Sequence, residues 1–123
     1  MWRQWIGLPH EFGADPRDGK AADCLVMVWA ILADAGIKCP KFRQEWLDLA
    51  RQGKWGVLQA MWEQNTQPLA KPEPHAVCLF ENGPQGLGVG IVVEQGLLIV
   101  HHKRGVHWVP IKAMQKLEYR RFK

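Results

Sequence analysis

Cys24 is the residue of this sequence with the clearest capacity for covalent chemistry. It opens an apolar stretch, residues 24–33, whose pattern predicts a buried helix, and it follows a turn-rich segment at residues 13–20. A thiol at a helix N-terminus lies near the positive end of the helix dipole and near unpaired backbone N–H groups. Both features lower the pKa of a thiol, so the sequence predicts a nucleophilic thiolate at Cys24 if a base lies beside it.

The histidines are the candidates for that base. His10 lies in the loop that leads into the cysteine, so its imidazole could reach the thiol. His101 ends an apolar segment that predicts a strand, and side-chain alternation along that strand places His102 on the opposite, solvated face. His10 and His101 are therefore the two candidate partners of Cys24, and His75 is interpreted as a loop imidazole at the surface.

The other polar clusters lack the spacing of a metal or nucleic-acid site. The histidines between residues 101 and 107 have no second pair of ligands elsewhere, so we expect no metal and no cofactor. The basic C-terminal end has no stacking aromatic platform and no phosphate-binding loop, so we expect no nucleic acid. It predicts a solvated edge or a contact to an acidic protein. Its basic residues are Lys112, Lys116, Arg120, Arg121 and Lys123.

Three helices are expected to position these groups in the first half of the chain. The first carries Cys24, with Asp23 as its N-cap and Gly36 as a C-cap candidate. Amphipathic patterns predict two more helices, over residues 41–52 and 54–65. The tryptophans of these two helices are interpreted either as core or as a docking surface, with at least one at an interface. They are Trp46, Trp55 and Trp62.

A small antiparallel sheet is expected in the second half. A proline-containing linker that cannot be helical, residues 68–74, precedes it. The predicted strands cover residues 76–80, 89–93, 97–101 and 106–110, with a turn at 82–86 and a tight connection at 94–96. Residues 111–117 predict a short helical turn and residues 118–123 a last edge strand. Helices followed by an antiparallel sheet define the α+β class.

Composition limits the domain organisation. A chain of 123 residues with 47% apolar residues is expected to form one domain, residues 1–123. An odd number of cysteines predicts free thiols, with Cys78 in the core and Cys39 in a loop. The start of the sequence predicts a short helical lead-in and lacks the apolar run of a signal peptide. The longest apolar run is too short to cross a bilayer, so no membrane span is expected.

The order of motifs along the chain resembles a known family. The motifs are Gly7-x-Pro9, Phe12-Gly13-x-Asp15-Pro16-x-x-Gly19, Asp23-Cys24, Gly36-Ile37, Val77-x-Leu79-Phe80, Val89-Gly90-Ile91 and Leu98-Ile99-Val100-His101. They resemble the NlpC-type papain-like cysteine hydrolases of cell-wall remodelling, most closely the short versions that tailed phages encode beside tail-tip proteins. The resemblance implies a papain-like fold with N-terminal helices on a small antiparallel sheet. It also implies cleavage of peptidoglycan stem peptides through an acyl-enzyme.

The resemblance also assigns roles to individual residues. It makes Cys24 the nucleophile and His101 the residue that orients the base, one position further along than usual. The position of the base is Gly88, which has no side chain to accept a proton. His10 stands where the family usually has a tyrosine, and a bulky pair, residues 25–26, replaces the small residue and glycine that normally follow the cysteine.

Two functions stay open. In the first, the chain is a tail-tip thiol hydrolase that cleaves peptidoglycan stem peptides during infection. In the second, it keeps the fold without the base and is a structural or binding component of the tail tip or of another assembly. Both predict synthesis in the host cytoplasm, a place in the virion tail and other tail-tip proteins as partners. A peptidoglycan peptide is a further partner if the thiol is active.

Overall fold

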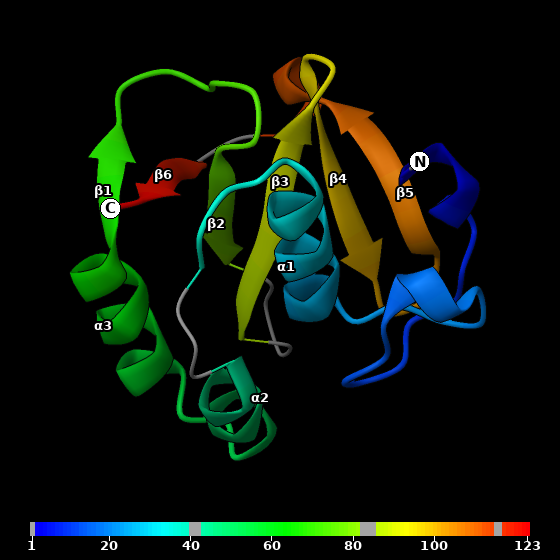
Figure 1. Ribbon diagram of the computed structural model, residues 1–123, viewed down its shortest axis with the longest axis horizontal. Helices are drawn as coiled ribbons and strands as arrows, with labels where there is room; N and C mark the ends of the chain where they lie inside the picture. The colour runs from blue at the N-terminus through cyan, green and yellow to red at the C-terminus, as the bar shows by residue number, and fades with distance from the viewer. Residues whose placement is uncertain (1, 40–42, 82–85, 115–116) are drawn as a thin grey trace.

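The computed structural model describes residues 2–39, 43–81, 86–114 and 117–123, and these residues form three α-helices and a six-stranded antiparallel sheet (Figure 1). The α+β prediction is confirmed. The helices are α1 (Cys24–Asp34), α2 (Arg43–Arg51) and α3 (Trp55–Asn65). The strands are β1 (Thr66–Leu69), β2 (Val77–Glu81), β3 (Leu87–Val93), β4 (Gly96–His101), β5 (Gly105–Pro110) and β6 (Glu118–Phe122), in the sheet order β1-β6-β2-β3-β4-β5. Short 3₁₀ helices cover Trp2–Trp5, Pro16–Asp18 and Ile111–Ala113.

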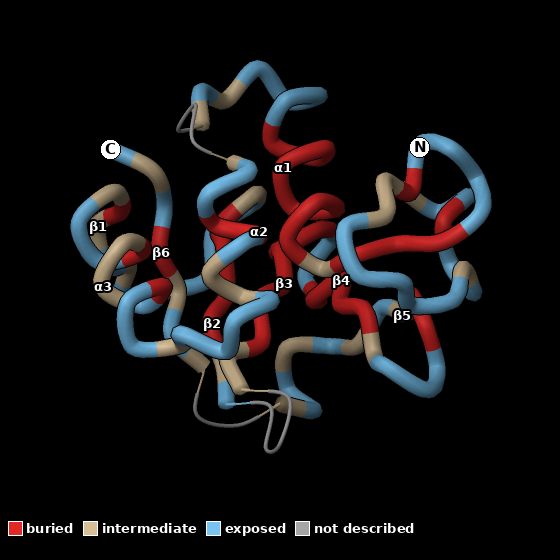
Figure 2. Tube along the Cα trace, turned by 90° about the horizontal axis from the view of Figure 1, so that it is seen from below, coloured by how far each residue is buried: buried red, intermediate tan, exposed pale blue. Residues whose placement is uncertain are grey.

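Helix α1 is the central element of the core. Asp23 caps its N-terminus as predicted, and Ala35 and Gly36 end it. The N–H of Gly36 donates to the carbonyl of Ala33 and the N–H of Ile37 to that of Leu32, which is a Schellman motif with a left-handed glycine. Eight consecutive residues from Leu25 to Leu32 are buried (Figure 2), since the helix packs on β3 and its Trp29 packs on Trp46 of α2 and Trp62 of α3.

Four aromatic rings join the helices to the sheet. Trp29 of α1, Trp46 of α2 and Trp62 of α3 meet with ring centroids 4.7–5.8 Å apart, in edge-to-face and tilted contacts. Phe122 of β6 packs on Trp62 at 5.4 Å. Trp46 and Trp62 are therefore core residues, whereas Trp55 is half-buried and remains available for contacts.

The strands at the C-terminal end differ from the prediction in one respect. Strand β6 is not an edge strand, because it pairs with β1 on one side and with β2 on the other. On this side of the sheet the edge strand is β1, whose last two residues, 68–69, belong to the segment that we expected to be a linker. Its Pro68 is exposed, and an edge strand tolerates proline because one side of it needs no donor.

Strands β3 and β4 pair only near their shared turn. The predicted tight connection is confirmed, with Glu94 and Gln95 both at positive φ, as a two-residue type I′ turn requires. The ladder runs from Val93 opposite Gly96 to Ile91 opposite Leu98, and beyond it the two strands diverge (Figure 1). The divergence opens the sheet beside the start of α1.

Parts of three predicted elements lie outside the described residues. They are residues 82–85 of the turn, residues 41–42 at the start of the second helix, and residues 115–116 of the segment predicted as a helical turn. Of that last segment, residues 111–113 form a 3₁₀ helix.

Candidate functional site

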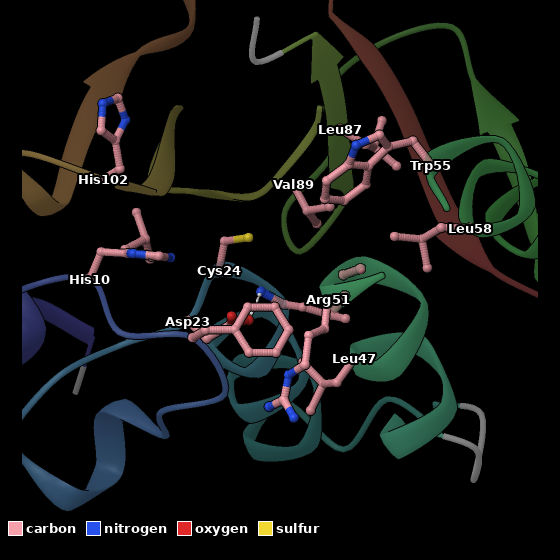
Figure 3. A pocket seen from close by; sticks show the side chains of 14 residues that line it. His10, Asp23, Cys24, Leu47, Arg51, Trp55, Leu58, Leu87, Val89 and His102 are labelled. Carbon is pink, nitrogen blue, oxygen red and sulfur yellow. Dashed lines mark hydrogen bonds between the residues drawn. The ribbon is translucent and has the colours of Figure 1, made fainter. Parts of the chain in front are cut away.

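A pocket of about 320 Å³ lies over Cys24 where β3 and β4 diverge (Figure 3). Five regions of the chain meet there: the loop before α1, the first turn of α1, the end of α2, the start of α3, and strands β3 and β4 with the turn after β4. The lining residues are His10, Phe12, Asp23, Cys24, Leu25, Leu47, Ala50, Arg51, Trp55, Leu58, Leu87, Val89, Val100 and His102. The sequence thus predicted correctly that Cys24 lies at the junction of a loop and a helix.

Asp23 connects the loop before α1 to the first turn of α1, at the base of this pocket. One carboxylate oxygen accepts from the N–H groups of Leu25 at 2.8 Å and Val26 at 3.2 Å, which caps α1. The other oxygen accepts from the N–H of Gly13 at 3.1 Å and so fastens the preceding loop to the helix. The carboxylate is buried and has three backbone donors, so it is a structural anion and not a base for the thiol.

Cys24 is a thiol, not the thiolate that its position predicts. Burial, and after it the neighbouring Asp23 carboxylate, raises the pKa of Cys24 to about 12. Backbone hydrogen bonds from Val89, Leu25 and Cys24 itself favour the thiolate but are weaker than burial. The prediction of a lowered pKa is wrong chiefly because the sulfur is removed from water, and secondly because the N-cap carboxylate of Asp23 places a negative charge beside it.

Two histidines line the pocket, His10 and His102. His10 was predicted as a candidate partner, and it reaches the pocket from the loop before α1. In the described part of the chain, no hydrogen bond joins a histidine ring to the Cys24 sulfur. Figure 3 shows the sulfur directed toward the side of the pocket where Val89 lies, away from His10.

His101 lies outside the pocket, so the face expected for it is wrong, whereas His102 is exposed as predicted. Leu98 and Val100 of β4 face α1, so His101 and Ile99 take the other face and His102 returns to the side of the pocket. The His101 Nδ1 accepts from the N–H groups of Lys103 and Arg104, at 3.1 and 3.2 Å, and this closes the turn after β4. The ring is therefore a turn-stabilising group.

Gly88, the position assigned to the base, also faces away from Cys24. A Cβ at this position would come within 2.3 Å of the Phe80 ring, on the face of the sheet opposite α1. The residues of β3 that do face the thiol are Leu87 and Val89, which are apolar. The strand beside the cysteine therefore offers no side chain that can accept a proton.

Sequence reasoning did not place Phe12, Arg51 and Trp55 at the site, although Phe12 lies in a quoted motif and Trp55 was considered for a docking surface. The Arg51 guanidinium lies over the Phe12 ring, 4.9 Å from its centroid. Trp55 packs against the backbone of Gly86, where a Cβ would come within 2.2 Å of the indole. No local pattern brings these residues together, because they come from a loop and two helix ends that meet through the packing of α2 and α3.

Comparison with known proteins does not assign the chain to a family. No family model, no curated protein and no solved structure matches the chain significantly. Within the described residues, no group of three or more histidine, cysteine, aspartate or glutamate side chains is arranged to hold a metal ion. No helix in that part of the chain is long and apolar enough to span a membrane. The fold and the site thus define an α+β domain with a pocket over a half-buried cysteine.

Proposed function

We propose that this domain is a phage tail component of the NlpC-like, papain-like type that binds peptidoglycan stem peptides in the Cys24 pocket without cleaving them. The observation that carries the proposal is the composition of the pocket wall. A cysteine at the start of α1 faces the sheet, as in a thiol hydrolase, but the strand beside it presents Leu87 and Val89.

The pocket has the features of a peptide-binding site. Its wall is largely apolar, and polar groups enter from His10, Arg51 and His102. On the side facing β4, the backbone of β3 has no ladder partner before Ile91 among the described residues. An extended peptide can pair with such a strand segment through its main chain, while its side chains occupy the pocket.

One observation favours a second function, a thiol hydrolase. His10 and His102 line the same pocket as Cys24, and a histidine that forms no hydrogen bond in the free protein can form one when substrate binds. In that mechanism one of these rings takes the thiol proton and later gives it to the leaving amine.

The pH dependence of thiol alkylation separates the two functions. Because burial raises the pKa of Cys24 to about 12, iodoacetamide is expected to modify it slowly at neutral pH, with a rate that rises with pH toward that value. Mass spectrometry of the modified peptides assigns the rate to Cys24, with the Cys24→Ala variant as the control. A midpoint below about 8, in the free protein or with stem peptide bound, would support the hydrolase instead.

Peptide binding and cleavage are then measured directly. Wild type and Cys24→Ala are expected to bind a synthetic stem peptide with similar affinity, and neither is expected to release fragments. Cleavage by wild type that Cys24→Ala abolishes would establish the hydrolase. Absence of binding to both proteins would refute the proposed function. Detection of the chain in purified virions by mass spectrometry tests the assignment to the tail.

A further inference from the structure

Arg51 is a cation at the rim of the Cys24 pocket that has no anionic partner. The ion pairs of the described residues involve Arg3, Arg17, Arg120 and Arg121, and none involves Arg51. All 12 aspartate and glutamate residues of the sequence lie within the described ranges, so no acidic side chain outside them is left to pair with it. The guanidinium is exposed and lies against an aromatic ring, that of Phe12.

The Phe12 contact orients Arg51 for binding. A guanidinium that lies over a ring uses its face in a cation–π interaction, while its N–H donors lie in its own plane. In the described part of the chain these donors have no protein acceptor. A planar fork of free donors matches the two oxygens of a carboxylate, which binds through two parallel hydrogen bonds.

The other charges of the pocket favour an anion. Asp23 is the carboxylate of the lining, and its oxygens already accept three backbone N–H groups. Lys103 and Arg104 follow His102 in the turn after β4 and are exposed. A negative group on a ligand would therefore meet Arg51 without a competing free carboxylate of the protein.

We propose that Arg51 binds a carboxylate of the peptide ligand, so that the pocket selects peptides with free carboxylates over their amides. This inference rests on the proposed peptide-binding function. Phe12 is the positioning residue, because it holds the guanidinium at the pocket rim. A pocket of about 320 Å³ has room for a residue or two, so the carboxylate that is bound belongs to a short stretch of the peptide.

The test uses one peptide in two forms. The probes are the stem tripeptide L-Ala-γ-D-Glu-L-Lys with all carboxylates free and the same tripeptide with all carboxylates converted to amides. Wild type is expected to bind the acid form about tenfold or more tightly, since hydrogen bonds to a charged group are strong. Arg51→Gln is expected to bind both forms equally, and Arg51→Lys to keep only part of the preference because an ammonium lacks the fork.

Lys54→Gln is the matched control. Lys54 is exposed, does not line the pocket and lies three residues from Arg51, so the variant loses the same charge nearby. It is expected to keep the wild-type preference, and thermal melts verify that all variants are folded. Equal binding of both forms by wild type, or the same preference in Arg51→Gln, overturns the role of Arg51 while peptide binding stands. Failure of wild type to bind either form overturns both proposals.

Discussion

Asp23 connects the folding of the site with its chemistry. Its two carboxylate oxygens hold α1 and the loop before it, and its charge also raises the pKa of the adjacent thiol. The residue that caps the helix therefore adds to the effect of burial in making Cys24 a poor nucleophile. The same sequence signal, an Asp-Cys pair at a helix start, fits both a reactive and an inert cysteine, and the side chains across the pocket decide between them.

Replacing Asp23 tests its contribution to the stability of the fold. We expect Asp23→Ala to lower the free energy of unfolding by about 2 kcal/mol, because it removes the cap and the bond to Gly13. Asp23→Asn is expected to recover about half, since its amide oxygen still caps the helix. Urea denaturation measures both. Asp18→Ala, at an exposed site in the same region, serves as the control and should change stability by less than about 0.5 kcal/mol. An effect of Asp23→Ala as small as this would contradict the role.

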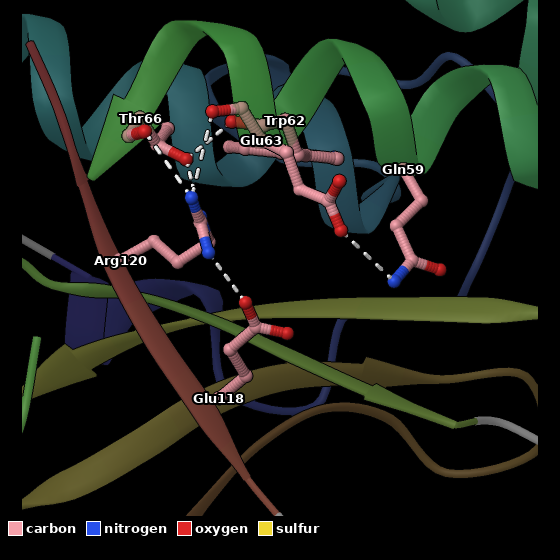
Figure 4. A network of polar contacts seen from close by, with 6 residues as sticks. All are labelled: Gln59, Trp62, Glu63, Thr66, Glu118 and Arg120. Carbon is pink, nitrogen blue, oxygen red and sulfur yellow. Dashed lines mark hydrogen bonds and ion pairs between the residues drawn. The ribbon is translucent and has the colours of Figure 1, made fainter. Parts of the chain in front are cut away.

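At the level of elements, Arg120 joins β6 to the end of α3 and the start of β1 (Figure 4). Its Nε donates to the Thr66 hydroxyl at 2.6 Å and its other nitrogens to the Thr66 carbonyl at 3.2 Å and to Glu118 at 2.5 Å. The Thr66 hydroxyl in turn donates to the Trp62 carbonyl. The prediction that the basic end is solvated is wrong for Arg120, which is only 7% exposed.

Arg120→Met is expected to lower the free energy of unfolding by about 2–3 kcal/mol, because it leaves the buried Thr66 acceptors without their donor. Arg120→Lys should cost less, since it keeps the charge but cannot reach both partners. The control is Arg121→Met in the same strand. Arg121 pairs with Glu73 at 3.8 Å with both side chains more than half exposed, so its loss is expected to cost under about 0.5 kcal/mol. Equal effects at both positions, measured in urea, would refute the distinction.

The elements were largely predictable from the sequence, and their order in the sheet was not. Apolar periodicity and turn residues act locally, so they located α1, β3, β4 and the turn between them. The insertion of β6 between β1 and β2 depends on pairing across about 50 residues, which no local pattern encodes. The face of the sheet on which His101 lies depends on which residues of β4 contact α1. Because β4 is apolar on both faces, its sequence does not indicate which face this is.

For the molecule as a whole, the last strand is part of the centre of the fold. Strand β6 is paired on both sides, and Phe122 completes the aromatic cluster of Trp29, Trp46 and Trp62. The N–H of Lys123 also donates to the carbonyl of Asn65 at the end of α3. The helices and the first and last strands are therefore expected to unfold together, as a single cooperative unit.

Changes in β6 test this cooperativity. A chain that ends at Leu117 is expected not to fold, because removal of residues 118–123 leaves β1 and the inner edge of β2 without partners. Phe122→Ala keeps the strand, so it is expected to fold and to lose about 2–3 kcal/mol from the aromatic cluster. In urea, its tryptophan fluorescence and far-UV circular dichroism should shift to the same lower midpoint. Separate midpoints for the two signals of Phe122→Ala would contradict a single cooperative unit. A truncated chain with the wild-type midpoint would contradict it as well, because only a strand outside the cooperative unit can be removed without unfolding the rest of the domain.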